Sequence, residues 1–304
     1  SITFDFGGPL QEETIQELHI TPANIRYSLN PSSKHITFYR NHKDKERVRM
    51  KYIYMNLTSV LMYGESGSEI WESIYSSSGE FYYPMRRGVE YSARVKFSVP
   101  ESLIVVSHSG IDATKWHKEN RCVPLNFAFL NREKYARQRM TGRYGCDVYQ
   151  VIGEQVDSMR YEQLCRFVEE STQWFEEKYG EKYLCNRYGT ATYPAFIFHN
   201  GNSSFNRYNM GFISASQEKF ATYPDIYPII HEIGHRWMGE YTMFINSGER
   251  GYAFIIETLN EFMTLMCIRD IVGAEVYEAI LNSYRANWEA IRGTEQDIHP
   301  IDVT

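Results

Sequence analysis

Two histidines and a glutamate in the stretch HEIGHRWMGE (231–240) have the residue types and spacing for metal chemistry. His231 and His235 are four residues apart, so on a helix they lie about one turn apart on one face. Their imidazole nitrogens can therefore bind the same zinc ion, at Zn–N distances of about 2.0–2.1 Å. Glu232 points elsewhere, and from there a carboxylate can take a proton from a zinc-activated water. The spacing predicts a zinc site with Glu232 as general base.

A catalytic zinc site of this kind needs a third protein ligand and an open position. The next helical stretch, YAFIIETLNEFMTLMCIRDIVG (252–273), offers Glu257 and Glu261, four residues apart on one face. Two acids on an otherwise apolar stripe are costly to bury without a cation or hydrogen-bond donors, which favours a metal nearby. We expect Glu257 to be the third ligand and Glu261 to be a hydrogen-bond partner of a ligand imidazole. The predicted content is one Zn²⁺ per chain.

The elements that must position these residues differ between the two halves of the chain. The first half has the alternating and β-branched patterns of strands. We expect strands within 34–41, 47–57, 91–100 and 102–110, and turns at 64–69 and 76–80. The pattern breaks near residue 144, at TGRYG. The sequence therefore predicts a β domain over residues 1–143 and an α+β domain over residues 144–304.

The second half combines helices with short strands. Helical spacing and glycine stops predict helices at 158–180, after Pro228 through the histidine motif, at 252–273 and at 274–293. Short strands are expected at 193–200 and 210–216. On the motif helix we expect Trp237 in the core, and Arg236 and Glu240 as a solvated pair. The predicted fold class is α+β, with the candidate metal site in the second domain.

Composition sets limits on the class of protein. The chain of 304 residues, 43% hydrophobic and 23% charged, is typical of a globular protein with room for two domains. A net charge of −6 argues against nucleic-acid binding. Five cysteines without a C-x-x-C pair indicate free thiols rather than a disulfide framework. No apolar run approaches the roughly 20 residues that span a bilayer. No signal peptide is visible at Ser1, which favours the cytoplasm, although a trimmed N-terminus would leave export open.

Several segments resemble the aminopeptidase N and leukotriene hydrolase family of zinc metallopeptidases. HEIGHRWMG (231–239) resembles the family's zinc helix, H-E-L-A-H-Q-W-F-G, and FIIETLNEF (254–262) is similar to its W-L-N-E-G-F-A-x-Y segment. IHPIDV (298–303) looks like its H-P-I-x-V segment. Residues 96–110 resemble the end of a saddle-shaped β domain, and residues 168–183 resemble the helix that opens a thermolysin-like catalytic domain. The resemblance implies a saddle-like β domain, present in part, then a thermolysin-like zinc peptidase that removes residues from peptide N-termini.

Two departures concern the metal site. His235 and Glu257 are separated by 21 residues, where the family has eighteen. The three additional residues fit a longer loop within 241–254. The family's oxyanion-stabilising tyrosine follows the H-P-I segment and would lie beyond Thr304, so we expect the catalytic domain to continue past this sequence.

A third departure concerns the substrate. By the resemblance, Tyr208 stands where the family has the glutamate that binds the substrate amine, and Asn209 stands on the asparagine of the same motif. Gly211 and Phe212 begin a strand that would line the cleft and offer backbone groups to an extended peptide. We therefore predict a zinc-dependent peptidase of aminopeptidase-like architecture acting on peptides or proteins. The alternatives are an endopeptidase-like or unusually specific peptidase that lacks the amine anchor, and an inactive zinc-bearing module that binds peptides.

Overall fold

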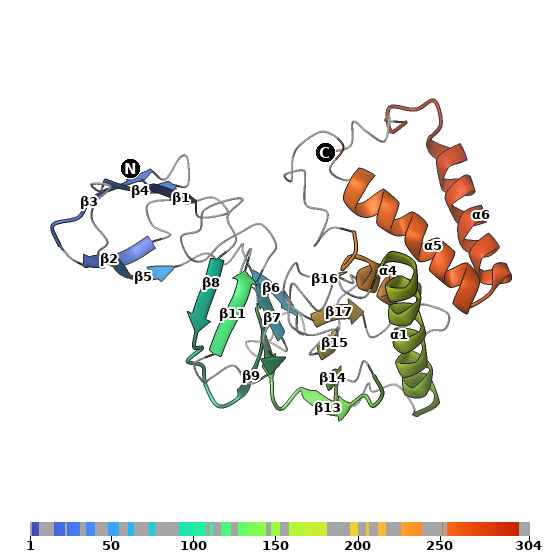
Figure 1. The fold of residues 1–304 in the computed structure, drawn as a ribbon, viewed down its shortest axis with the longest axis horizontal. Helices are drawn as coiled ribbons and strands as arrows, with labels where there is room; N and C mark the ends of the chain where they lie inside the picture. Colours follow the sequence, from blue (N-terminus) through green and yellow to red (C-terminus); the bar gives the residue numbers. More distant parts are fainter. Residues whose placement is uncertain are drawn as a thin grey trace.

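In the computed structural model of the protein, strands dominate the first part of the chain and helices the last (Figure 1). The structure describes residues 2–5, 15–21, 23–30, 35–39, 48–54, 60–63, 73–76, 91–107, 110–111, 117–122, 127–143, 147–152, 158–180, 195–199, 205–206, 212–216, 226–238, 251 and 254–297. The expected turns at 64–69 and 76–80 lie outside these ranges, apart from Ser76, which ends a strand.

The described residues of the first part of the chain lie mainly in strands, as the sequence pattern predicted, and these strands pair antiparallel. The four expected ranges contain β4 (His35–Tyr39), β5 (Arg49–Tyr54), β8 (Tyr91–Val95) and β9 (Leu103–Ser107). Further described strands are β1 (Ile2–Asp5), β2 (Ile15–Thr21), β3 (Arg26–Asn30), β6 (Val60–Tyr63), β7 (Ser73–Ser76), β10 (Gly110–Ile111), β11 (His117–Cys122) and β12 (Phe127–Asn131). They pair as β1-β4-β3, β2-β5, β11-β8 and β10-β9-β12-β7-β6.

A second five-stranded sheet, in the order β13-β14-β15-β17-β16, supports the helices. Its strands are β13 (Tyr135–Arg139), β14 (Asp147–Val151), β15 (Ala195–His199), β16 (Phe205–Asn206) and β17 (Phe212–Ser216). Strands β14, β15 and β17 run parallel, with an antiparallel strand at each edge. Parallel neighbours need a crossover connection, and helix α1 (Ser158–Tyr179) lies between β14 and β15 in the chain.

Four helical segments in addition to α1 are described in the last third of the chain. They are α4 (Tyr227–Gly234), the π-helix η3 (Phe254–Thr258), α5 (Leu259–Ile271) and α6 (Ala274–Ile291). The expected helices at 158–180 and 274–293 are thus confirmed, and the one expected at 252–273 begins as a π-helix. None of the described helices has an apolar stretch long enough to cross a membrane.

The motif helix is shorter than expected, since α4 ends at Gly234 and His235 is its C-cap. Beyond it, the amide of Arg236 bonds to the carbonyl of Ile233 at 3.2 Å, and that of Trp237 to Gly234 at 2.8 Å. These are i→i+3 bonds, which tighten the last turn of a helix and satisfy its terminal carbonyls. The chain therefore continues to coil as far as Met238, whose amide bonds to the carbonyl of Gly234 at 3.0 Å.

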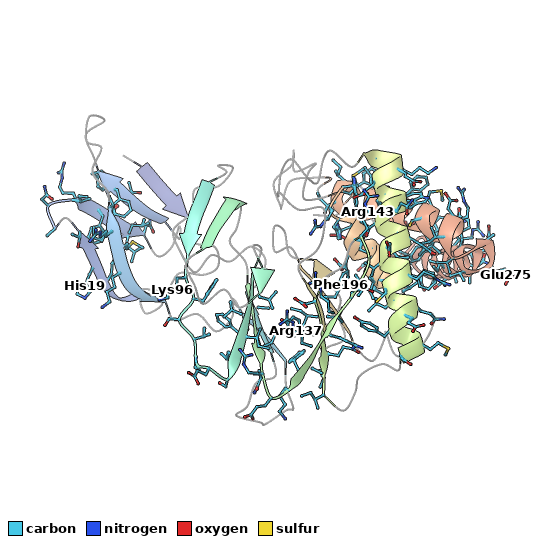
Figure 2. All side chains as sticks on the ribbon, turned by 60° about the horizontal axis from the view of Figure 1, so that its bottom comes forward. His19, Lys96, Arg137, Arg143, Phe196 and Glu275 are labelled. Atoms are coloured by element: carbon cyan, nitrogen blue, oxygen red, sulfur yellow. The ribbon has the colours of Figure 1, made fainter. Side chains whose placement is uncertain are left out.

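The main core fills the space between this sheet and helices α1, α4 and α5. Phe196 on β15, Phe175 on α1 and Ile230 on α4 are each at most 1% exposed. Figure 2 shows Phe196 on the side of the sheet that faces α1. Three isoleucines of α4, at 229, 230 and 233, are turned into this core, so α4 is held against a rigid support.

A second core joins the two five-stranded sheets. Val106 of β9 and Leu130 of β12 pack with Tyr149 of β14 and Ile197 of β15, and all four are fully buried. The predicted domain boundary, between residues 143 and 144, falls in the connection between the paired strands β13 and β14. The boundary stays a prediction, while the order of a β part followed by an α+β part matches the expected fold class.

Candidate metal centre

Helix α4 brings the two motif histidines together. Pro228 stands in its first turn, where a missing amide hydrogen costs nothing because that amide has no partner in a helix. The amide of His235 still bonds to the carbonyl of His231 at 3.2 Å, so the four-residue spacing keeps its helical geometry at the C-cap. The two rings meet edge to face, with centroids 4.7 Å apart and an interplanar angle of 89°. Both side chains are largely buried, at 17% and 12% exposure.

Glu257 completes a set of three donors. Its Oε2 lies 3.4 Å from Nε2 of His231 and 3.4 Å from Nε2 of His235. Ligand atoms of the three residues all lie within 4.8 Å of one another. Two ligands that each lie about 2.1 Å from a tetrahedral zinc are themselves about 3.4 Å apart. The donor types and spacing therefore fit a zinc ion with an open fourth position.

The π-helix η3 carries Glu257 at the entrance to α5, a feature that the sequence reasoning missed. A π-helix has i→i+5 hydrogen bonds and is rare, and such turns are frequent at functional sites. Glu257 is 57% exposed, whereas Glu261, on the following α-helical turn, is only 20% exposed. The two acids, expected on one face, thus contact different atoms of the same imidazole ring.

Glu261 contacts the opposite nitrogen of His231. Its Oε2 lies 2.8 Å from Nδ1 of that ring. His235 has an equivalent partner, since its Nδ1 lies 3.0 Å from the carbonyl oxygen of Met238. Acceptors at both Nδ1 atoms favour the tautomer with hydrogen on Nδ1, which leaves each Nε2 lone pair free for a metal.

The charges around the donors favour a cation between them. Hydrogen bonds from His231 and His235 hold the pKa of Glu257 well below its usual range. Burial lowers the pKa of His235, but its hydrogen bond to Glu257 and the charges of Glu232 and Glu257 outweigh burial and raise the pKa overall. Burial raises the pKa of Glu261. Without a metal, His235 therefore holds a proton more readily, and Glu257 stays ionised beside it. Negative charge is thus concentrated at the site, and it favours a cation there.

Asn260 fixes the distance between α4 and α5. This fully buried side chain donates from Nδ2 to the carbonyl oxygen of His231 at 2.8 Å. A Cβ atom on Gly234 would come within 2.3 Å of Asn260 Oδ1 and 2.9 Å of Phe175 Cζ. Only glycine at position 234 lets the two helices approach this closely, and the approach brings Glu257 and Glu261 to His231.

Of the other residues of the motif helix, some lie where the sequence predicted and others do not. Trp237 lies in the core, stacked on Phe175 with centroids 5.0 Å apart. Arg236, expected in solvent, is only 5% exposed, because it follows the buried Ile233 by three positions and Ile229 by seven, and so shares their helix face. Its expected partner Glu240 lies outside the described residues. Glu232 is 7% exposed, beside the histidine pair, where its charge raises the pKa of His235.

The expected substrate residues are only partly placed. Tyr208, Asn209 and Gly211 lie outside the described residues, as does the segment 298–303. Phe212 is the first residue of β17, which runs parallel to β15 and antiparallel to β16. Helix α4 packs against β16 and β17, so this edge of the sheet adjoins the candidate metal centre.

Two tyrosines were missed by the sequence reasoning. Tyr227, at the start of α4, and Tyr284, on α6, both donate hydrogen bonds to Oε1 of Glu261. Their hydroxyl oxygens are 2.5 Å apart. Tyr227 precedes His231 by four residues and so shares its helix face, which is a signal that the sequence contained. Nothing in the local sequence around Tyr284 indicates the contact.

Comparison with known proteins identifies the fold. The sequence matches no protein-family model and no curated protein. Among solved structures, an M1 zinc metallopeptidase from Deinococcus radiodurans matches with a TM-score of 0.56 at 14% identity, over 100% of this chain and 69% of that one. An aminopeptidase N family protein from Idiomarina loihiensis matches with a TM-score of 0.58 at 12% identity, over 88% of this chain. This chain spans about half the length (49%) of the Idiomarina protein.

A third structure is an M1 zinc metallopeptidase mutant from Deinococcus radiodurans bound to a Tyr-Ser-Ala substrate, with a TM-score of 0.53 at 14% identity. It is covered over 67% of its length by 95% of this chain. The chain therefore has the fold of the two-domain M1 zinc metallopeptidases, with an N-terminal β part followed by an α+β part that carries the helices.

A first prediction separates the two acids of α5 and η3. We expect Glu257→Gln to lower the zinc affinity of the protein more than Glu261→Gln does. Loss of an outer partner costs about 10–100-fold in metal affinity, and loss of a direct ligand should cost more. Chelator competition on the two purified variants measures both affinities, with Glu275→Gln on α6 as an exposed control. A larger loss for Glu261→Gln would reverse the assignment.

Proposed function

We propose that the protein is a zinc metallopeptidase in which His231, His235 and Glu257 hold the ion. The observation that carries the proposal is the position of Glu257 Oε2, 3.4 Å from Nε2 of both histidines. The fold shared with M1 zinc metallopeptidases supports the same function. When bound, zinc lowers the pKa of a water molecule to about 7 and polarises a peptide carbonyl.

Glu232 is the residue to which we assign proton transfer. It follows His231 directly, the residue is 7% exposed, and its charge acts on His235. In peptide hydrolysis, its carboxylate takes a proton from the attacking water and then donates it to the nitrogen of the leaving amine. The C–N bond breaks as that nitrogen is protonated, so one carboxylate serves both steps. Glu261 holds Nδ1 of His231 and orients the ring throughout.

The proposal is tested by peptide hydrolysis with and without a chelator. We expect the zinc-loaded protein to cleave members of a mixed peptide library, and the chelated protein to cleave none. Readdition of zinc should restore cleavage. A zinc-loaded protein that binds peptides and cleaves none would support the inactive peptide-binding module instead. The presence of Glu232 beside the donor set favours the enzyme, because peptide binding alone has no chemical need for that acid.

A second prediction concerns the substrate amine. A buried ammonium group without a negative partner is costly, and Tyr208 supplies no charge near neutral pH where the related family has a glutamate. We therefore expect the protein to cleave one peptide at similar rates with a free and with an acetylated N-terminus. Product analysis by mass spectrometry measures both rates.

A preference for the free N-terminus would be measured as a ratio of the two cleavage rates. Faster cleavage of the free form by about a hundredfold corresponds to roughly 3 kcal/mol of transition-state discrimination. Such a ratio would show that an amine anchor exists elsewhere and would make the protein an aminopeptidase. Similar rates would support an endopeptidase-like specificity.

A further inference from the structure

The two carboxylate oxygens of Glu261 accept hydrogen bonds from different residues. Oε2 accepts from Nδ1 of His231 at 2.8 Å. Oε1 accepts hydrogen bonds from the hydroxyls of Tyr227 and Tyr284. A carboxylate bound through one oxygen alone can rotate about its last side-chain bond, but one held through both oxygens has a defined plane. The two tyrosines therefore decide where Oε2 points.

Tyr284 reaches Glu261 because α5 and α6 form a helical hairpin. Gly273 ends α5 with a φ of 132°, a conformation that L side chains rarely adopt, and α6 then returns along α5. Glu261 stands twelve residues before Gly273, and Tyr284 stands eleven residues after it. Both helices rise about 1.5 Å per residue, so positions equally far from the turn lie side by side. Figure 1 shows α6 turning back from the end of α5, with the two helices meeting at this turn.

The tyrosines lie on the side of His231 that faces away from the ligand atoms. Glu261 Oε2 meets the ring at Nδ1, and both hydroxyls bond to the other oxygen of Glu261, whereas Glu257 meets the ring at Nε2. Both hydroxyls are thus separated from the Nε2 ligand atom by the Glu261 carboxylate and the imidazole ring. Neither tyrosine is therefore placed to touch a substrate oxygen, and their effect must pass through Glu261 and His231.

Helix α6 is only partly buried. None of its residues is fully buried, Val276 and Ile280 pack against the main core, and Tyr284 itself is 39% exposed. The hydroxyl of Tyr284 nevertheless contacts both Glu261 and the hydroxyl of Tyr227, 2.5 Å away. Tyr284 thus links the partly exposed helix α6 to Glu261, the hydrogen-bond partner of His231.

We infer that Tyr227 and Tyr284 are positioning residues of the metal centre. Through Oε1 of Glu261 they hold Oε2 on Nδ1 of His231, which keeps the hydrogen on Nδ1 and the Nε2 lone pair turned toward Glu257. The docking of α6 on α5 thereby strengthens zinc binding. This inference rests on the proposed function, because it concerns the same metal centre.

The test measures zinc affinity of the whole chain by chelator competition. The variants are Tyr227→Phe, Tyr284→Phe and the double variant, which remove only hydroxyls and keep the rings. Tyr277→Phe is the control, since it removes a hydroxyl from α6 about two turns earlier. We expect each single variant to weaken zinc binding several-fold relative to the control, and the double variant to approach the loss of Glu261→Gln, about 10–100-fold.

The same tyrosine change made in a Glu261→Gln protein distinguishes a positioning role from a general loss of structure. In a Glu261→Gln protein, the added Tyr284→Phe change should weaken zinc binding no further, because the tyrosine acts through that carboxylate. An equal loss in both backgrounds would overturn the inference. So would zinc affinities of the tyrosine variants that equal those of Tyr277→Phe, and in that case the proposed metal centre would stand.

A spectroscopic measurement reports the tautomer directly. In ¹⁵N-labelled, metal-free Glu257→Ala protein, in which Nε2 of His231 no longer faces that carboxylate, imidazole shifts should show His231 with hydrogen on Nδ1. The same protein with both tyrosine changes added should show a mixture of tautomers, and an unchanged tautomer would overturn the inference. Failure of the wild-type protein to bind zinc at all would instead overturn the proposed function and, with it, this inference.

Discussion

We expect replacement of His231 or His235 by alanine to abolish stoichiometric zinc binding by the isolated protein. In the proposed site each imidazole supplies one of three ligand atoms, and the two Nε2 atoms each lie 3.4 Å from Glu257 Oε2. With two ligands left, the site loses both a bond and the convergence that holds an ion. Since loss of an outer partner alone costs about 10–100-fold, loss of a ligand should exceed a hundredfold.

Metal analysis of the purified variants measures this loss. His19→Ala is the matched control, because His19 is an exposed histidine on β2, far from the helices that carry the site (Figure 2). It should retain one zinc per chain, as we expect of the wild-type protein. Retention of one zinc per chain by the His231→Ala, His235→Ala double variant would show that the ion is bound elsewhere.

The second large effect is expected for Glu232→Gln, which should remove peptide hydrolysis and leave zinc bound. An amide keeps the size of the side chain but cannot take a proton from water. General-base assistance typically contributes about 10²–10⁴-fold, or roughly 3–5 kcal/mol of the activation barrier. Because Glu232 is adjacent to the donor set and outside it, we expect the zinc content of the variant to match that of the wild-type protein.

The control is Glu275→Gln, an exposed glutamate in the first turn of α6 that Figure 2 shows at the far end of the helical part. Its hydrolysis rate and zinc content should both equal those of the wild-type protein. Full activity in Glu232→Gln would exclude this carboxylate as the proton acceptor. Loss of zinc together with activity would show that Glu232 supports the site structurally.

Local sequence patterns predicted the elements that depend on short-range chemistry. The 3.6-residue spacing and the glycine stops of α1 and α6 predicted both helices to within two residues of their ends. Strands β4, β5, β8, β9, β15 and β17 fall inside the ranges that alternation and β-branching predicted. The pairing of His231 with His235 also follows from local spacing, because four residues make about one helical turn whatever the rest of the chain does.

The choice between Glu257 and Glu261 shows where sequence reasoning reaches its limit. Four-residue spacing puts the two acids on one face of an α-helix, and the preference for Glu257 had to come from a resemblance in which the loop length differs. In the structure, η3 makes a π turn at Glu257 and α5 continues as an α-helix at Glu261. This places one acid at Nε2 of His231 and the other at Nδ1. No local propensity distinguishes a single π turn from an α turn, because hydrogen bonding and packing around the turn decide it.

By itself, the sequence determined the spacing of His231, Glu232 and His235, the strand and helix ranges, and the order of a β part before an α+β part. Only the tertiary structure decided which oxygen meets which nitrogen. The contact between Asn260 and Gly234 sets the separation of α4 and α5, and the hairpin at Gly273 brings Tyr284 to Glu261. Contacts of this kind join residues far apart in the chain. Tyr284 and Glu261 are 23 positions apart, and His231 and Glu261 are 30 positions apart. Such distant pairs meet only when whole helices pack, so their geometry follows from the combined burial of many side chains and not from any local pattern.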